Sequence, residues 1–346
     1  GPPMSPRTFT VIAAATLIAV LAAAVALVQT RGAPEMAGQG DPVFPGLLDR
    51  VNDVSALVID HAKGRITLER GRAGWTVKES DGYPGRKVKI QRAILGLARL
   101  QFREPKTRIK EKYAKLDLRD RDEKGSRSKR VKLFDNTGQA VADILVGKER
   151  DKLPGDSSQS YYVRRPGTVQ TWLAGGATDI TAIKRDWLER KIVNVEAKRV
   201  RRIVLNQPGA ETIVLIKAKP EDKDFSLETM PKGKKLIDPS GPNLAGQALA
   251  DLLLDGARKG TGPFDPAKTA TADFTTFDGL TVKARIVKEG GKHRMRLEAV
   301  GENEAAKEAQ DINARTAGWV YGISEYSASN LMKRLGDLVE DEKPKS

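Results

Sequence analysis

Apolar residues recur along the chain with two different spacings. Stretches in which apolar and polar residues alternate favour strands with one buried face, whereas apolar residues three and four positions apart favour an amphipathic helix. Ile90, Ile94, Leu97 and Leu100 have the second spacing and predict a helix over 87–102. Strands are predicted on both sides of it, over 54–59, 65–70, 75–79, 130–135, 140–147, 160–164 and 168–173, with a further helix over 179–190.

The same order of elements recurs from Val200. Strands are predicted over 202–205, 211–217, 225–229, 272–277, 281–288, 294–300 and 318–323, and helices over 243–254 and 326–340. Ser324 is a suitable N-cap for the last helix. Phe134-Asp135 and Phe277-Asp278 occupy matching positions, and a polar, helix-prone insertion at 301–317 is the main difference between the copies.

Asn136-Thr137-Gly138 and Asp278-Gly279 are typical hairpin turns, so the strands should pair antiparallel. We therefore expect an α+β protein in which an N-terminal transmembrane helix precedes two similar antiparallel-sheet-plus-helix units, 51–195 and 196–340, with a tail at 341–346. Chance similarity remains an alternative to a true repeat, because strand–strand–helix patterns are common.

Residues 9–28 are uncharged and Ala-rich, and as a helix they would reach about 30 Å, the thickness of a hydrocarbon core. The following Gln29, Thr30 and Arg31 are a poor cleavage context, which favours an uncleaved signal anchor over a cleaved signal peptide. We expect residues 1–8 to hold a tag remnant (Gly1-Pro2) and a cytoplasmic N-terminus, and 29–50 to be a tether. The localisation predicted is the bacterial inner membrane, single-pass, with the bulk of the chain periplasmic.

The composition removes several kinds of chemistry. The chain of 346 residues has no Cys and two His, which excludes disulfides and thiolate chemistry and disfavours a His-rich metal centre. His61 and His293 are both predicted to be solvated loop residues. Gly256, Gly260 and Gly262 are wrongly spaced for a phosphate-binding loop. We expect no cofactor and no catalysis, although a carboxylate-based hydrolase remains a third possibility.

Two further groups of residues have competing interpretations. The acidic string Asp117, Asp120, Asp122 and Glu123 is interleaved with basic residues, which favours a solvated charged loop over a cation site. The four tryptophans could line a ligand groove, but on predicted strands and helix faces they are more often core residues; they are Trp75, Trp172, Trp187 and Trp319.

Positive charge is densest over 103–130, in a chain with 60 Lys and Arg against 45 Asp and Glu and a net charge of +15. This stretch could contact a partner or an anionic surface, or it could simply keep the protein soluble. The candidate contact residues are Arg103, Lys106, Arg108, Lys110, Lys112, Arg127, Lys129 and Arg130. Nucleic acid is a poor fit, because aromatic residues are only 5% and no stacking platform appears.

Several motifs follow one another in a distinctive order: Gly74-Trp75-Thr76-Val77, the helix over 90–100, Tyr113–Asp117, Val131–Asp135, Ile144–Gly147 and Tyr161–Arg164. In this order the chain resembles the bacterial family named domain of unknown function 4340, most clearly over 53–203. Lys115 stands where that family normally has Gly. The resemblance supplies no catalytic residues.

The resemblance implies a membrane-anchored periplasmic accessory protein, with an ABC permease, its ATPase and a gliding-motility-like auxiliary protein as partners. We therefore expect a non-catalytic accessory or interaction subunit of an ABC-type transport system, held in the inner membrane through residues 9–28. The alternative is a periplasmic ligand-binding module for a lipid or a glycan, with a groove between the two units. A filled interface between the units would count against that alternative.

Overall fold

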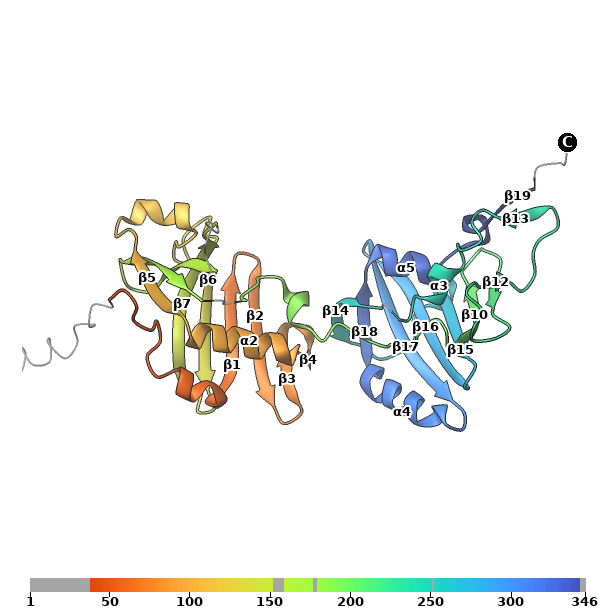
Figure 1. Ribbon diagram of the computed structural model, residues 1–346, viewed down its shortest axis with the longest axis horizontal. Helices are drawn as coiled ribbons and strands as arrows, with labels where there is room; N and C mark the ends of the chain where they lie inside the picture. Colours follow the sequence, from red (N-terminus) through yellow and green to blue (C-terminus); the bar gives the residue numbers. More distant parts are fainter. Residues whose placement is uncertain (1–37, 152–158, 177–178, 251, 343–346) are drawn as a thin grey trace, which may run out of the picture.

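The computed structural model describes residues 38–151, 159–176, 179–250 and 252–342. The anchor predicted over 9–28 and the tag remnant lie outside these residues. Among the helices of the described ranges, none combines the length and the apolar character needed to cross a bilayer. The described chain is α+β, and its strands form two large sheets with antiparallel pairing, arranged side by side in an elongated body (Figure 1).

The first sheet has nine strands in the spatial order β4-β3-β2-β1-β6-β7-β8-β9-β5. In chain order they are β1 (Val54–His61), β2 (Gly64–Gly71), β3 (Gly74–Val77), β4 (Tyr83–Pro84), β5 (Gln101–Pro105), β6 (Lys129–Asp135), β7 (Ala140–Glu149), β8 (Ser160–Arg164) and β9 (Thr171–Gly175). Their burial alternates, as in β6, where Val131, Leu133 and Asp135 face inward. This confirms the period-two pattern read from the sequence.

The second sheet has eight strands in the order β12-β11-β10-β15-β16-β17-β18-β14. They are β10 (Val200–Asn206), β11 (Ile213–Ile216), β12 (Ser226–Leu227), β14 (Leu254–Lys259), β15 (Ala270–Thr276), β16 (Leu280–Glu289), β17 (Lys292–Gly301) and β18 (Trp319–Ile323). A separate pair joins β13 (Lys234–Leu236) to β19 (Val339–Asp341). Apart from β4, the two sheets have the same order when their strands are matched in sequence, which is the arrangement that duplication of one unit would produce.

Helices cover parts of both sheets. The α-helices are α2 (Lys87–Ala98), α3 (Asn243–Gly246), α4 (Ala305–Thr316) and α5 (Glu325–Leu331). Short 3₁₀ helices are η1 (Leu48–Asp53), η2 (Lys78–Ser80), η3 (Lys110–Leu116), η4 (Lys184–Trp187), η5 (Pro266–Lys268) and η6 (Leu335–Asp337). Helix α2 lies across the first sheet (Figure 1) and buries Ile90, Ile94 and Leu97. Helix α4 lies within the predicted insertion, and the cap predicted for α5 is confirmed, since Ser324 Oγ accepts a hydrogen bond from Ser327 N.

Four predicted helices are too long. The helix over 87–102 ends at Ala98, because Gln101 and the residues after it pair with β9 as strand β5. The helix over 179–190 is reduced to η4, since the carbonyl of Trp187 accepts a hydrogen bond from Arg86 N instead of from its own segment. In both places tertiary pairing takes the backbone groups that a longer helix would use.

The other two helices are cut short for the same reason. The helix over 243–254 is limited to α3, because Leu254 begins β14 and pairs with Ile323. The helix over 326–340 ends at Leu331, and the chain from Val339 becomes a strand beside β13. Apolar spacing alone did not distinguish these segments from longer helices.

The two sheets are joined through the segment that links them. On one side, Leu188 forms a bridge with Gly85, and Glu189 N donates to Pro84 O at the edge strand β4. On the other, Lys191 forms a bridge with Leu253, and Leu254 N donates to Arg190 O at β14. The linking segment therefore hydrogen-bonds to both sheets at their facing edges.

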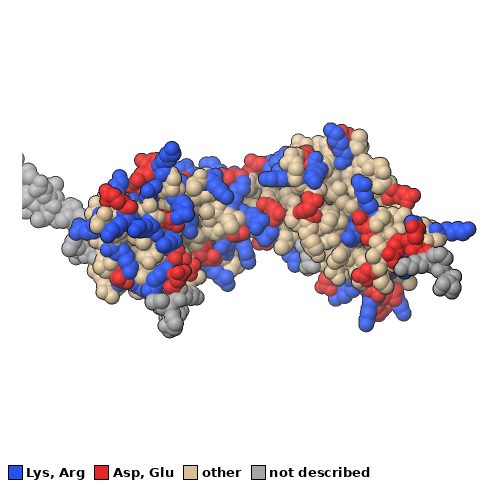
Figure 2. All heavy atoms as spheres, turned by 90° about the horizontal axis from the view of Figure 1, so that it is seen from above, with Lys and Arg blue, Asp and Glu red and all other residues tan. Residues whose placement is uncertain are grey.

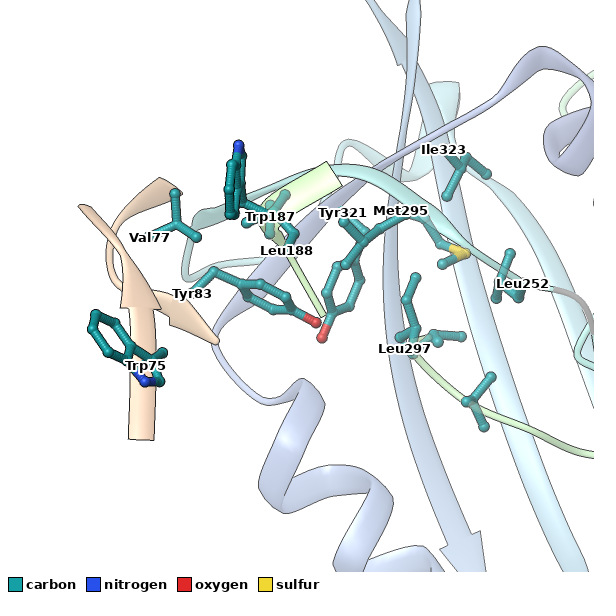
Figure 3. Close-up of a cluster of buried hydrophobic side chains, with 14 of the residues drawn as sticks. Trp75, Val77, Tyr83, Trp187, Leu188, Leu252, Met295, Leu297, Tyr321 and Ile323 are labelled. Carbon is teal, nitrogen blue, oxygen red and sulfur yellow. The ribbon is translucent and has the colours of Figure 1, made fainter. Parts of the chain in front are cut away.

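Aromatic side chains fill the place where the units meet. Tyr83 of the first unit packs edge-on against Trp319 and Tyr321 of the second, with ring centroids 4.9 Å and 6.0 Å apart. Figure 3 shows the rings of Tyr83 and Tyr321 side by side with their hydroxyl groups turned toward each other, and Leu188 beside Tyr83. Nearby, Lys259 N donates to Asp81 Oδ2 across the same junction at 2.9 Å. The space between the units is therefore packed at this point.

We expect the junction to lose stability at alkaline pH. Burial raises the pKa of Tyr83 to about 12 and raises that of Tyr321 further. A raised pKa contributes stability that is present below the unfolded value near pH 10 and is lost as the pH rises through the folded value. Between about pH 9 and about pH 12, wild type should lose about 1–2 kcal/mol more than Tyr83→Phe in denaturant unfolding. Equal losses in the two proteins would contradict this prediction.

Candidate functional site

The eight predicted contact residues belong to several parts of the first unit. They are distributed over β5, η3, the start of β6 and the loops that connect these elements, and several of them pair with carboxylates of the same unit. The ion pairs are Lys106–Glu104 (2.7 Å), Lys110–Glu123 (3.7 Å), Arg127–Asp117 (2.9 Å) and Arg130–Asp143 (2.7 Å). Arg103 donates to Ser160 Oγ, while Arg108 and Lys112 are exposed. Much of this charge is therefore used within the fold.

The acidic string belongs in part to that internal network. Asp120 accepts a hydrogen bond of 2.7 Å from Arg164, which is 2% exposed and also donates to Leu118 O. The guanidinium of Arg164 lies over the ring of Tyr113, 4.6 Å from its centroid. The Asp120 side chain is still 39% exposed, so the string lies in a solvated loop as predicted, but Asp120 also serves as the charged partner that a buried arginine needs.

The two histidines lie in different sheets. His293 is only 6% exposed and its Nδ1 lies 3.2 Å from Glu325 Oε2, so its prediction as a solvated residue is wrong. His61 ends β1 and is partly exposed. Over the described ranges, no three His, Cys, Asp or Glu side chains gather as metal ligands would.

The tryptophans lie in or against the core, in agreement with the core interpretation. Trp187 is fully buried and Trp75 is 7% exposed, whereas Trp172 and Trp319 are partly buried against the same cluster. Figure 3 shows Trp75 and Trp187 on either side of Val77, where β3 meets the linking segment.

The first unit contains an open groove of about 1020 Å³. One wall is the C-terminal half of α2, with Arg92 and Leu95, followed by the C-cap residue Arg99. The opposite side is formed by the end of β1, the ends of β7 and β8, and residues 179–183. The groove is thus built by segments far apart in sequence, which the sheet and its covering helix bring together.

The charged side chains that line this groove are mainly basic. Three carboxylates face six cationic side chains, which we call the basic groove residues: Lys63, Arg92, Arg99, Arg127, Lys129 and Lys148. Two of the carboxylates already have partners, because Asp117 pairs with Arg127 and Asp179 pairs with Lys89. The groove therefore has an excess of positive charge that its own acidic residues do not balance.

The pKa values of two groups in the groove reflect burial and the charges around them. The pKa of His61 is lowered by burial first and then by the positive charges of Arg121, Lys63 and Lys129, with only Asp60 acting in the opposite direction. The pKa of Lys129 is also lowered by burial, and its Nζ donates to Ile180 O at 3.2 Å. The lowered pKa of His61 is expected where positive charge is concentrated and partly desolvated, whereas the pKa of Lys129 is lowered because burial outweighs the opposite effect of Asp117 and Glu149.

Sequence reasoning found only part of this site. Arg127 and Lys129 were among the predicted contact residues, but Lys63, Arg92, Arg99 and Lys148 were not. A usable signal was present for two of them, because Arg92 on α2 and Arg99 at its C-cap are seven residues apart, a spacing that places both on one side of the helix, off the apolar stripe. Nothing in the sequence indicated that β7 would place Lys148 beside them.

A second cavity, of about 740 Å³, lies beside α4 in the second unit. Its basic side chains have partners: Arg285 pairs with Asp273 at 2.6 Å, and Lys283 with Glu298 at 3.8 Å. Arg296 lies over the ring of Phe264, 5.1 Å from its centroid. Compared with the first groove, this cavity has less unbalanced charge.

The surface as a whole is strongly charged. On the face drawn in Figure 2, Lys and Arg side chains are numerous over the first unit, with Asp and Glu scattered between them. Such a surface suits contact with an anionic partner or ligand, and it also favours solubility.

Comparison with known proteins places the chain in a family. No curated protein and no solved structure matches it significantly. Its sequence does match, over residues 75–258, the family described as Domain of unknown function (DUF4340). The match runs from β3 of the first sheet to β14 of the second and so includes the junction between them. Because it covers more than half of the chain, this protein belongs to the family of the domain of unknown function 4340.

Proposed function

We propose that this chain is a non-catalytic accessory subunit of an ABC-type transport system. Residues 9–28 would hold it in the bacterial inner membrane, and its two units would lie in the periplasm. Its partners would be the permease and ATPase subunits and a gliding-motility-like auxiliary protein. The observation that carries the proposal is membership of the family. An accessory role in such a system is what the resemblance to that family implied.

The geometry of the body supports an interaction role. The described chain starts on the β5 side of the first sheet, where Gly40 N donates to Phe102 O and Val43 N to Leu100 O. The second unit lies at the other end of the elongated body (Figure 1). With an anchor before residue 38, the first unit would lie nearest the bilayer and the second would extend away from it. Such a subunit could contact a permease near the membrane and another partner farther out.

The test is purification of the full-length protein from its native membrane in mild detergent, followed by mass spectrometry. We expect the permease and the ATPase in stoichiometric amounts. A matched control replaces residues 9–28 with an unrelated single-span anchor, so that retained partners would indicate docking through the periplasmic units. A protein that comes out alone with either anchor, after gentle crosslinking as well, would contradict the proposal.

A ligand groove between the two units, the alternative considered from the sequence, receives no support from the junction. Tyr83, Trp319 and Tyr321 pack together there, and the two cavities described above each lie within one unit. We therefore propose no second function at that place.

A further inference from the structure

The basic groove of the first unit has the size of a ligand site. Its volume of about 1020 Å³ lies at the upper end of the range of roughly 300–1,000 Å³ usual for small-molecule sites. Its walls come from several parts of the fold rather than from a single loop: α2 and the ends of β1, β6, β7 and β8 supply part of the lining, and the segments that connect them, with residues 179–183, supply the rest. Arg92 on α2 and Lys148 on β7 belong to elements that hold side chains in place better than a loop does.

Several cations of the groove are not used by the fold. Within the described part of the chain, Arg92, Arg99 and Lys148 make no ion pair, and all three are exposed. This distinguishes them from Arg127 and from the paired residues over 103–130. Like charges held close together repel each other, and a bound anion would remove that cost.

The positions of the cations favour one kind of anion. They come from three parts of the fold: α2 and its C-cap contribute Arg92 and Arg99, β7 contributes Lys148, and the turn after β1 contributes Lys63. Convergence from several sides suits the tetrahedral oxygens of a phosphate better than a single planar carboxylate. Arginine and lysine are also the side chains that proteins commonly use for phosphate.

The groove is not entirely polar. Leu95 and Ile180 line it, and Ile183, which is 51% exposed, lies at its rim. An apolar part of a ligand could therefore lie beside its charged group. Such a mixed lining is usual in sites where a few polar groups orient a partly apolar molecule.

We propose that the basic groove binds a phosphate-bearing ligand, with its phosphate held by Arg92, Arg99 and Lys148. The phosphate can belong to a soluble phosphate compound or to the headgroup of a lipid, since both present the same charged oxygens. This binding does not depend on the accessory role proposed above, so either can fail without the other.

The test is isothermal titration calorimetry on the full-length protein in mild detergent, with two probes. Inorganic pyrophosphate supplies the charged group alone, and dihexanoyl phosphatidic acid supplies a phosphomonoester with two short acyl chains. The variant Arg92→Glu/Arg99→Glu should weaken binding roughly tenfold or more, because charge-assisted hydrogen bonds are lost and repulsion is introduced. The control Lys288→Glu/Lys292→Glu makes the same change of charge on an exposed hairpin of the second unit and should bind like wild type.

Each outcome has a defined meaning. Binding of both probes that depends on the groove supports recognition of the phosphate itself. Binding of only the lipid probe, again dependent on the groove, supports a lipid source and a role for the apolar wall. The proposal is overturned if neither probe binds, or if the groove variant and the control weaken binding equally. Far-UV circular dichroism and thermal midpoints of all proteins would exclude loss of folding as the cause.

Discussion

Replacing Trp187 with alanine is expected to lower the free energy of unfolding by about 3–5 kcal/mol. The side chain is fully buried, and its Nε1 donates to Thr181 O at 3.0 Å. The ammonium of Lys89 lies over its ring, 4.9 Å from the centroid. Alanine would leave a cavity in place of the ring and remove both polar contacts. Denaturant unfolding followed by far-UV circular dichroism would measure the loss.

Trp187 lies on the segment that links the two sheets, so the substitution should also weaken the contacts of this segment at the junction. Arg86 N donates to Trp187 O, and the next residue, Leu188, bridges to the edge strand β4. A matched control is Ile183→Ala on the same segment, where the side chain is 51% exposed and we expect a change of less than about 0.5 kcal/mol. If Trp187→Ala prevents folding, Trp187→Phe should give a smaller, measurable loss. Similar small effects of Trp187→Ala and Ile183→Ala would refute the assigned role.

The second large effect is expected at Gly147, where alanine should destabilise the protein by about 3 kcal/mol. A Cβ added there would lie 2.0 Å from the backbone oxygen of Leu116 and 3.1 Å from the side chain of Leu118. The end of η3 and the chain that follows it would therefore have to move away from β7. That movement would disturb the small cluster of Tyr113, Leu118 and Leu145.

Gly256 is a suitable control for Gly147. It lies in β14, and an added Cβ would meet no heavy atom within 4 Å. Gly256→Ala should be neutral or slightly stabilising, because alanine loses less conformational entropy than glycine on folding. The thermal unfolding midpoints of both variants should be measured. The added methyl group meets the backbone in Gly147→Ala and meets no atom in Gly256→Ala, so the difference between the midpoints reports the cost of the clash. Equal midpoints would show that the contact with Leu116 is easily relieved.

The sequence was informative where neighbouring residues determine the structure, as they do in hairpins. Alternating apolar residues and turns such as Asn136-Thr137-Gly138 and Asp278-Gly279 located the hairpins β6–β7 and β15–β16 to within a few residues. Their signal is local, since alternation and turn chemistry depend on neighbouring residues. The family resemblance rested on the same kind of local motif and is confirmed by the match over 75–258.

Helix lengths were harder to predict, because distant partners decided them. The segment from 179 to 190 has helical spacing, but β4 and β14 take its backbone groups through Leu188 and Arg190. His293 was misjudged for a similar reason. Its neighbours in sequence are polar, yet β18 pairs with its strand, and Glu325, in the first turn of the following helix, contacts its ring.

By itself, the sequence determined the α+β class, the positions of the hairpins, the helix over the first sheet, the excess of positive charge and the family. Only the tertiary structure decided where that charge acts. Arg92 on α2, Arg99 at its C-cap and Lys148 on β7 lie around one groove with Arg127, whereas Arg130 pairs with Asp143 within the sheet. Charge and periodicity are properties of neighbouring residues, but a binding groove depends on which distant strands pair and which helix covers them.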